Sequence, residues 1–341
     1  MRIVVVGGGM AGLVLARALM RRGIAPVVLE RGEGGGTAEG AIMLPFQAYE
    51  ALEDLGLYGT VRGAGRDVAV GEDGRPVSIA LARQILLDLI AEGVDVRNDQ
   101  EVLDLLRDGD RVVGVRVRTQ AGEEDVPADL VVGADGTMSR VRELAGIPHV
   151  TRPSEGGGLS YRSPVVTPFS FVMAYQSDGR QVGVMSWPQG SAGWWQIDRI
   201  GREAALAPGL EAFKRSFLRL MPAAEASLEG VTSMDQVHYR EVTEVLAERW
   251  WNPGVVVIGE AAHAMDPESG VGAGLGFGDA LQLARSIEVH PEDPDQACAH
   301  YERWRRPVVD PYVQIGAQGA RIPQMPPDMP RPPWEYWPPR D

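Results

Sequence analysis

The chain has 341 residues, a net charge of −14 and a pI of about 4.9, which argues against nucleic acids and anionic membranes as main partners. Its apolar content of 44% and charged content of 23% are those of a globular protein with one large or two closely packed domains. Cys298 is the single cysteine, and no apolar run approaches the roughly 18 residues of a membrane span. We therefore expect a cytoplasmic protein, monomeric or homodimeric, without an intrachain disulfide.

The N-terminal stretch carries the strongest local motif. Residues 2–6 form a β-branched apolar run typical of a buried parallel strand, and Gly7 to Gly12 follow with the pattern G-x-G-x-x-G. A helical pattern then leads to a second strand at residues 26–29, which ends in Glu30. Such glycines permit a tight turn, close approach to a pyrophosphate and close helix packing, and the acid accepts hydrogen bonds from a ribose. This order of elements predicts a dinucleotide site.

Helices and strands alternate from residue 32 to residue 147. Residues 32–40 and 59–76 are predicted to be loops, the second with at most one strand at 68–70. Asp108-Gly109-Asp110 is typical of a hairpin turn, and Ser139 is placed to cap a helix. The predicted helices are 47–57, 81–90 and 139–145, and the predicted strands are 94–96, 101–107, 111–119 and 129–133.

Near residue 156 the pattern changes to short apolar and aromatic runs separated by Pro, Gly, Ser and Asp. These runs predict an antiparallel sheet of roughly four strands, at 159–166, 169–175, 181–187 and 193–199. Trp187, Trp194 and Trp195 lie within the runs. They are interpreted either as the core of this sheet or as a wall against a flat apolar substrate.

The C-terminal part returns to the pattern of a parallel α/β sheet. Its predicted elements are helices at 209–221, 223–229, 279–287 and 294–320 and a strand at 255–258. Pro307 and Pro311 are expected to kink or divide the last helix. We expect an α/β, Rossmann-like cofactor domain with an inserted antiparallel sheet. The expected divisions are 1–75 and 79–155 with 250–320 for the cofactor domain, 156–249 for the substrate domain, and 321–341 for a proline-rich tail.

Three motifs, taken together, resemble a known family. The first is Gly7 to Gly12 with Glu30, the second is the segment 129–136, and the third is the segment 259–272. Their order and spacing resemble the single-component, group A FAD-dependent monooxygenases of the para-hydroxybenzoate hydroxylase type, which include aromatic and polyketide hydroxylases. The resemblance covers about residues 1–60, 79–147 and 250–287.

The resemblance implies non-covalent FAD, with NADH or NADPH as a transient reductant. It implies that reduced flavin combines with O2 and that a C4a-hydroperoxide hydroxylates a small aromatic or polyketide-like substrate. An epoxidase, or a dehydrogenase or reductase of the same fold, stays open as an alternative. A catalytically silent flavin-binding partner protein is the alternative from another functional class.

The resemblance also assigns residues to the cofactor. The FAD-binding candidates are Gly7, Gly9, Met10, Ala11, Gly12, Glu30, Arg31, Arg83, Asp135, Gly136, Gly259, Glu260, Gly270, Val271, Gly272 and Ala273. Pro267, Gly270 and Gly272 are expected beside the isoalloxazine as the catalytic segment. The helix that follows is expected to direct its N-terminus at the flavin N1–C2=O edge, which is negative in reduced flavin. Glu260 and Gly274 depart from the family pattern, which usually has Asp and Asn there.

Candidates for substrate contact carry alternatives. Arg162 binds an acidic substrate or pairs with a surface carboxylate, and Asp266 faces the flavin or caps a turn. His263 is interpreted as a structural, hydrogen-bonded residue rather than a base. No Cys/His cluster has metal-ligand spacing, so no metal is expected. The full set of substrate candidates is Met43, Arg162, Trp195, Tyr239 and Asp266.

Overall fold

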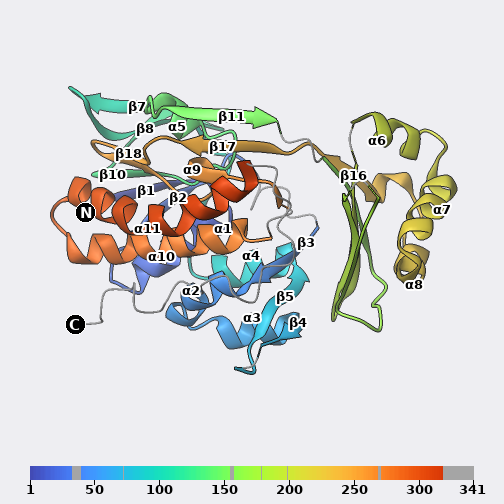
Figure 1. Ribbon diagram of the computed structural model, residues 1–341. Helices are drawn as coiled ribbons and strands as arrows, with labels where there is room; N and C mark the ends of the chain where they lie inside the picture. The colour runs from blue at the N-terminus through green and yellow to red at the C-terminus, as the bar shows by residue number, and fades with distance from the viewer. Residues whose placement is uncertain are drawn as a thin grey trace.

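The computed structural model describes residues 1–32, 40–71, 73–153, 157–177, 179–197, 199–267 and 270–317. The chain forms a larger α/β body and a smaller layer of one sheet with helices on its far side (Figure 1). Residues 33–39 of the predicted loop at 32–40, and the whole predicted tail at 321–341, lie outside the described residues.

A six-stranded sheet forms the centre of the body, in the order β18-β19-β10-β1-β2-β6. Its strands are β1 (Ile3–Val6), β2 (Val27–Leu29), β6 (Val96–Arg97), β10 (Leu130–Gly133), β18 (Trp251–Asn252) and β19 (Val255–Val257). All pairings are parallel except that of β18 with β19. Since Val6 pairs with Gly133, and Gly133 with Val257, the carboxyl ends of these strands meet at one edge. Ligands bind at this edge in open α/β sheets.

Helices and a small meander enclose this sheet. On one side lie α1 (Met10–Met20), α10 (Gly272–Val289) and α11 (Pro294–Ala317); on the other lie β7 (Glu101–Asp108), β8 (Arg111–Thr119), β9 (Gly122–Pro127) and α5 (Arg140–Leu144) (Figure 1). The predicted β7–β8 hairpin is confirmed, and Ser139 caps α5 by accepting from the Arg142 N–H. β9 was not predicted because its side chains are mostly exposed and polar, so no apolar alternation marks it.

The segment 59–76 was wrongly predicted to be a loop with at most one strand. It contains α3 (Tyr58–Ala64) and β4 (Arg66–Val70), and β5 (Pro76–Ala82) follows in a sheet of order β3-β5-β4, where β3 is Ala41–Pro45. Glycine lowers the helix propensity of α3, but Val61 is fully buried and Tyr58 packs 5.0 Å from Tyr49. Tertiary packing therefore outweighs propensity here. The predicted helix at 47–57 is shorter, as η1 (Phe46–Ala48) and α2 (Tyr49–Asp54), and α4 (Arg83–Ala91) follows β5.

The inserted layer is a five-stranded antiparallel sheet of order β13-β14-β15-β12-β16. Its strands are β12 (Gly158–Ser163), β13 (Phe171–Tyr175), β14 (Gln181–Trp187), β15 (Gly190–Gln196) and β16 (Val237–Arg240). Four strands were predicted; the fifth, β16, returns beside β12. The strand predicted to reach residue 199 ends at Gln196, and a helix begins at Arg199. The ribbon of β11 (His149–Pro153) and β17 (Thr243–Ala247) links this layer to the body.

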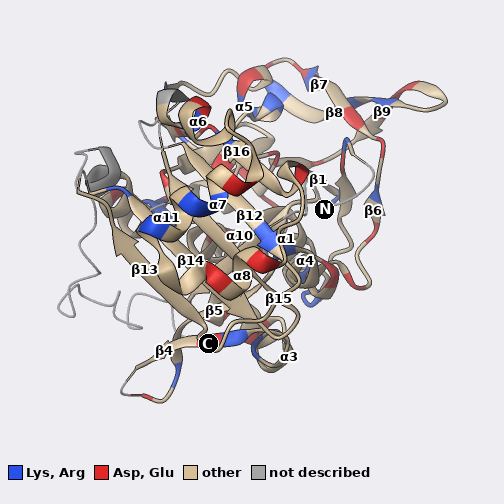
Figure 2. Cartoon of the chain, turned by 90° about the vertical axis from the view of Figure 1, so that its right-hand side faces the viewer, with Lys and Arg blue, Asp and Glu red and all other residues tan. Residues whose placement is uncertain are grey.

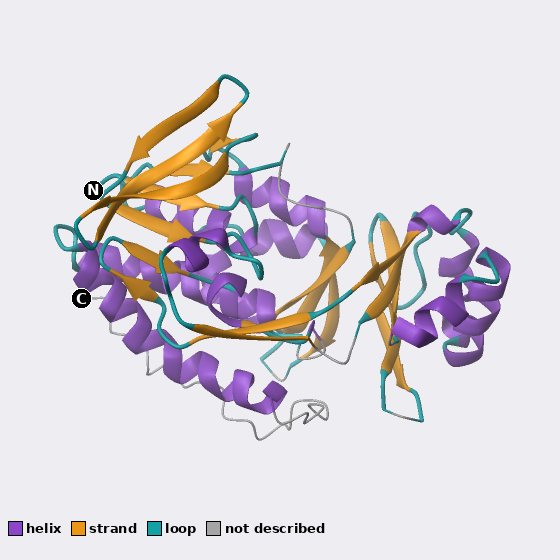
Figure 3. Ribbon diagram, turned by 90° about the horizontal axis from the view of Figure 1, so that it is seen from above, coloured by secondary structure: helices purple, strands orange, loops and turns teal. Residues whose placement is uncertain are grey.

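Helices cover one face of the inserted sheet, away from the body (Figure 3). They are α6 (Arg199–Leu206), α7 (Leu210–Leu220) and α8 (Glu225–Glu229), with short turns η2 (Pro222–Ala224) and η3 (Met234–Gln236). Phe213 and Phe217 of α7 are fully buried against the sheet, which gives the layer a core of its own. The outer side of these helices carries charges of both signs (Figure 2).

The C-terminal helices differ from expectation in two ways. α10 begins at Gly272 rather than 279, because its glycines hide the helical pattern while allowing close packing. The prolines were expected to kink or divide α11, and division is wrong, since one helix continues through Pro307 and Pro311. Its buried face, which includes Tyr301 and Val309, holds it on the body despite the lost hydrogen bonds. Among the described helices, none combines the length and apolarity required of a membrane span.

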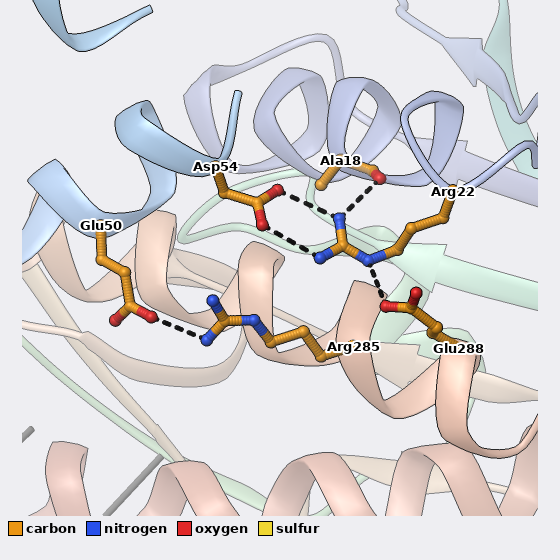
Figure 4. Close-up of polar contacts among 6 residues, drawn as sticks. All are labelled: Ala18, Arg22, Glu50, Asp54, Arg285 and Glu288. Atoms are coloured by element: carbon orange, nitrogen blue, oxygen red, sulfur yellow. Dashed lines mark hydrogen bonds and ion pairs between the residues drawn. The ribbon is translucent and has the colours of Figure 1, made fainter. Parts of the chain in front are cut away.

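An ion-pair network fixes α1 against α2 and α10 (Figure 4). The Arg22 guanidinium contacts both Asp54 oxygens at 3.1 Å and the Glu288 carboxylate at 2.8 Å. Arg285 of α10 donates from its Nη1 to the Glu50 Oε1 of α2 at 2.8 Å. Burial would raise the pKa of Asp54, but the hydrogen bonds and charge of Arg22 lower it. The network therefore fixes the C-terminal end of α1, whereas the N-terminal end of α1 follows Gly9.

Candidate cofactor and active site

The glycine turn between β1 and α1 is closely packed against the protein at its first and third glycines and has free space at its second glycine. A Cβ at Gly7, whose φ is +111°, would lie 2.3 Å from the Ala134 oxygen, and a Cβ at Gly12 would lie 2.1 Å from the Gly7 oxygen. At Gly9, by contrast, a Cβ would meet nothing within 4 Å. The first and third glycines are thus required by packing, whereas the second leaves space for a ligand to approach the backbone.

The N-terminus of α1 has no side-chain cap from the described residues. Its first turn, which includes Met10 and Ala11, contains no acidic residue. Unpaired N–H groups and the positive end of the helix dipole favour a phosphate at such a position.

Glu30 lies at the end of β2, as predicted, and is buried. Its carboxylate accepts from the Gly8 N–H at 2.8 Å and from the Gly32 N–H at 3.1 Å. These bonds fix the side chain beside the glycine turn and leave further lone pairs for a ribose hydroxyl. Arg31 is exposed next to it.

Asp135 and Gly136 form the turn that follows β10, next to Gly7. The Asp135 carboxylate accepts from the Ser139 hydroxyl at 2.5 Å and from the Val141 N–H at 3.0 Å. Burial raises the pKa of Asp135, and these hydrogen bonds oppose the rise. Since both oxygens are bound within the turn, Asp135 shapes the backbone beside the glycine motif.

The third motif meets the first at the start of α1. Gly259 has a φ of +59°, and a Cβ there would lie 3.1 Å from the Ala11 Cβ. A Cβ at Gly276 of α10 would lie 3.6 Å from the same atom. Segments from both ends of the chain therefore converge on Ala11, and small residues make this contact possible.

A buried charged cluster holds this convergence together. The fully buried Asp279 accepts from the Arg305 Nε at 2.9 Å and the Gly259 N–H at 2.9 Å, and its Oδ2 lies 2.6 Å from His263 Nε2. Burial would raise the pKa of Asp279, but the charges and hydrogen bonds of His263 and Arg305 lower it to about 2. Asp279 thereby joins α10, α11 and α9 (Glu260–His263).

His263 matches its structural interpretation. It is 2% exposed, its Nε2 is paired with Asp279, and its ring lies 5.4 Å from that of Trp250. The ring is thus enclosed by protein groups on the side of α9 that faces the core.

The N-terminus of α10 is the second uncapped helix end. Val271 provides no side-chain cap, and the first turn, which includes Gly272 and Ala273, has no acidic residue. Gly270 precedes it with a φ of +65°, and its N–H bonds the oxygen of the exposed Pro267 at 2.9 Å. Residues 268 and 269, between them, lie outside the described part of the chain.

The two departures from the family pattern have different surroundings. A Cβ at Gly274 would lie 2.8 Å from both Pro45 Cγ and Gln47 Cβ, so packing leaves no room for an asparagine side chain. Glu260 is exposed at the first position of α9, where the Thr137 hydroxyl lies 3.4 Å from its carboxylate. The longer acid therefore remains at the rim of the site.

Arg83, the first residue of α4, lies near enough to Glu260 for the two charges to interact. Its Nε is buried and has no hydrogen-bond partner among the described residues. Burial lowers its pKa; the charge of Glu260 opposes this shift, and the charge of Arg240 adds to it. A cofactor or substrate anion would satisfy this guanidinium.

The predictions for Trp195 and Tyr239 as substrate contacts are wrong about the face of the sheet. Side chains alternate between faces along a strand, and Trp195 points into the helical layer, with Phe217 6.3 Å away. Tyr239 belongs to the same core and lies under the Arg202 guanidinium at 4.5 Å. Neither side chain faces the body.

The residues on the opposite face were missed or left open. Trp194 is half-buried there and stacks on Phe171 with centroids 5.6 Å apart. The same face carries Ala192, which packs with Ala82 of the body. Because adjacent residues on a strand point to opposite faces, Trp194 and Trp195 must lie on different faces of the sheet. Composition alone does not indicate which of the two rings faces the body. Met173, Met185, His238 and Arg240 share this face by the same alternation.

The other substrate candidates are distributed around the site. Arg162 lies 5.8 Å from the Trp187 ring centroid, and the expected ion pair to a surface carboxylate is not found within the described residues. Met43 is half-buried in β3, opposite Ala80. Asp266 is half-buried between α9 and α10. Across the described ranges, no cluster of His, Cys, Asp and Glu could hold a metal ion.

Comparison with known proteins identifies the family. Residues 80–315 match the FAD binding domain family, and residues 5–39 match an NAD(P)-binding Rossmann-like domain. The chain belongs to the FAD-binding flavoprotein monooxygenases. These matches show FAD as its cofactor and NAD(P)H as the reductant.

Individual relatives of this flavoprotein include a hydroxylase and an epoxidase. The FAD-dependent urate hydroxylase of Mycolicibacterium vanbaalenii is 28% identical over 89% of this chain and 84% of its own length. A chloroplastic zeaxanthin epoxidase of an Oncidium hybrid cultivar is 26% identical over 89% of this chain, which spans 52% of that enzyme. The tetrameric form of 2-methyl-3-hydroxypyridine-5-carboxylic acid oxygenase shares the fold, with a TM-score of 0.79, 22% identity, and coverage of 96% of this chain and 94% of the oxygenase.

The buried cluster predicts a pH-dependent stability. Asp279→Asn leaves the Arg305 charge buried without its partner, so we expect the free energy of unfolding to fall by about 3–5 kcal/mol. The native pKa is depressed, so the stabilisation by Asp279 is complete above its ordinary value of 3.8 and is lost as the pH falls toward about 2. The free energy of unfolding, measured with urea across this pH range, should fall with falling pH in the wild type, and the part of this fall that comes from Asp279 should be absent from Asp279→Asn. Asp129→Asn, which breaks an exposed pair with Arg2, should cost under about 1 kcal/mol; equal losses in both variants would contradict the assignment.

The open side of Gly9 predicts a loss of cofactor affinity without a loss of stability. Gly9→Ala places a methyl group where the structure has space but where the pyrophosphate must approach, so we expect the Kd for FAD to rise roughly tenfold or more. The melting temperature of the FAD-free protein should stay unchanged. Gly59→Ala, also without neighbours within 4 Å, is the matched control and should keep wild-type affinity. Calorimetric titration with FAD measures both, and unaltered binding by Gly9→Ala would exclude this approach.

Proposed function

We propose that the protein uses NAD(P)H and O2 to hydroxylate a small aromatic or polyketide-like substrate. The observation that carries this proposal is the stacked pair of Phe171 and Trp194 on the face of the inserted sheet that lies toward the body. This face contacts the body through Ala192 and Ala82, and Ala82 directly precedes Arg83. An aromatic surface thus adjoins the candidate flavin site, which suits a flat ring held beside the cofactor.

FAD fits the residues present. The uncapped ends of α1 and α10, the open side of Gly9 and the unpaired Arg83 Nε are all suited to its phosphates and to the polar edge of its ring. In this proposal Glu30 holds the ribose, and Gly259 and Glu260 approach the ribityl chain. Bound FAD accepts hydride from NAD(P)H and activates O2.

The protein's own part in the reaction is binding, orientation and electrostatics. The N-terminus of α10 stabilises negative charge on an adjacent acceptor oxygen or nitrogen through its dipole and free N–H groups. Trp194 and Phe171, with Met173 and Met185 on the same face, orient a flat substrate and exclude water. We assign residues 156–249 to this substrate-binding part and the flanking segments to the cofactor-binding part.

The relatives support two oxygen-transfer outcomes. One relative is named a urate hydroxylase, and another a zeaxanthin epoxidase. We favour hydroxylation because the stacked pair on the sheet is better suited to a flat ring than to an extended chain. Small-molecule substrate, O2, cytoplasmic location and a monomeric or homodimeric state belong to the same proposal.

Turnover in labelled oxygen tests this function. Hydroxybenzoates, hydroxyquinolines and anthraquinones are screened for acceleration of NADH or NADPH oxidation by the FAD-loaded protein, and the product of the best compound is analysed by mass spectrometry under 18O2. We expect one labelled oxygen atom on an aromatic carbon. An oxidised product without label would contradict the monooxygenase and favour a dehydrogenase, and a labelled epoxide would favour the epoxidase. No acceleration by any compound would favour a silent flavin protein.

Trp194 predicts a change in substrate affinity. Trp194→Ala removes the half-buried ring from the sheet face, and the lost stacking of roughly 0.5–1.5 kcal/mol should raise KM for an aromatic substrate about twofold to twelvefold. The FAD content should stay unchanged. The control is Tyr175→Ala. Tyr175 is exposed at the end of β13, on the same face of the inserted sheet as Trp194. An unchanged KM in the Trp194 variant would remove this ring from the substrate site.

A further inference from the structure

Arg66 joins the body to the inserted layer through three consecutive carbonyl groups. Its Nη1 donates to the oxygens of Thr167 at 2.8 Å and Phe169 at 3.1 Å, and its Nη2 donates to the Pro168 oxygen at 2.8 Å. Arg66 belongs to β4 of the body, whereas the three acceptors lie between β12 and β13 of the inserted sheet. A planar, permanently charged guanidinium is suited to several fixed acceptors at once, which a lysine ammonium cannot match.

On the body side, Arg66 is held close to the candidate flavin site. It pairs with Ala80 of β5, and β5 ends at Ala82, directly before Arg83. A Cβ at Gly65 would lie 2.4 Å from Ile79 Cγ2, so the glycine lets β4 lie close against β5. The position of the Arg66 backbone is therefore fixed relative to the start of α4.

On the other side, the bound segment is tied firmly into the inserted sheet. The Thr167 N–H donates to the Ser186 hydroxyl at 3.1 Å, and the Ser186 N–H donates to the Ser170 oxygen at 2.9 Å. The next residue, Phe171, stacks on Trp194. Every step from Arg66 to the Phe171–Trp194 pair is therefore a hydrogen bond, a ring contact or a short stretch of backbone.

A second, apolar contact complements Arg66. Trp187 is fully buried and packs with Ala192 of its own sheet and Ala82 of the body. Together with the β11–β17 ribbon, these contacts fix the inserted layer at separate points. Each part also has a large hydrophobic core of its own, so removal of Arg66 leaves both cores intact.

We propose that Arg66 is a positioning residue, which holds the Phe171–Trp194 surface at a fixed distance from the start of α4 and thus from the cofactor. This inference rests on the proposed function for its catalytic consequence. If the surface is displaced, substrate no longer lies where activated oxygen is formed, so NAD(P)H and O2 are consumed with release of hydrogen peroxide instead of product. Two electrons from NAD(P)H and two protons then reduce O2 to H2O2, which balances the unproductive cycle.

The test compares Arg66→Ala, Arg66→Lys and Arg75→Ala in the FAD-loaded protein. Arg75 lies directly before β5, which is the neighbour of β4, but its side chain binds Glu53 of the body at 2.6 Å and makes the matched control. Hydrogen exchange of amides 169–175 is measured without substrate, and product and H2O2 per NAD(P)H are measured with the best compound of the screen.

We expect Arg66→Ala to keep wild-type FAD content and a melting temperature within a few degrees of the wild type. Its amides 169–175 should exchange at least several-fold faster, and product per NAD(P)H should fall by at least threefold. Arg66→Lys should be intermediate, and Arg75→Ala unchanged.

The outcomes separate this inference from the proposed function. Wild-type exchange and coupling in Arg66→Ala would overturn the positioning role, as would losses of coupling, FAD and melting temperature in the same proportion. A wild type that yields no oxygenated product contradicts the proposed function instead. In that case the exchange of amides 169–175 alone decides: a selective increase supports Arg66 as the anchor, and no increase overturns it.

Discussion

The buried ion pairs and hydrogen bonds of the Asp279 carboxylate are the interactions on which the rest of the site depends. This carboxylate binds Arg305 of α11 and, from α9, both His263 and the N-cap Gly259 N–H, so the three consecutive helices α9, α10 and α11 share one buried charge. Because buried ions are stable only when they are paired, each partner fixes the position of the others. This cluster lies behind the place where Gly259 and Gly276 contact Ala11. The charged core thus sets the geometry of the surface that we propose for the cofactor.

A consequence of this arrangement is that neither end of the chain forms the proposed cofactor site alone. The glycine turn after β1 supplies one uncapped helix end, and α10 supplies the other. The Arg22 network at the far end of α1 and the Asp279 cluster near its start fix these two helices against each other. The inserted layer is then attached to a rigid body, by the ribbon, by Trp187 and by Arg66.

The sequence predicted those parts of the fold that local chemistry determines. The strand–glycine–helix motif, the Asp-Gly hairpin and the Ser139 cap each require particular residues at particular positions, and the structure contains all three. Elements that depend on distant partners were missed: α3 is stabilised by burial of Val61, and the first turn of α10 by close packing of its glycines. Arg66 and Arg305 have no local signal, since their acceptors lie far away in the chain.

The choice between Trp194 and Trp195 shows the same limit at the substrate side. Both residues lie on β15, and adjacent residues point to opposite faces. Which face meets the body is decided by the partner layers, namely α7 for Trp195 and the small sheet near Ala82 for Ala192 and Trp194. Composition indicates an aromatic sheet, but only the pairing register and the layers assign each ring to a core or to a site.

The most direct test of this account is a crystal structure of the FAD-loaded protein. We expect the pyrophosphate at the N-terminus of α1 beside Gly9, and the flavin ring between the N-terminus of α10 and the sheet face that carries Trp194. A flavin bound on the opposite face of the inserted sheet, beside Trp195 and α7, would contradict it. So would a pyrophosphate distant from the β1–α1 turn.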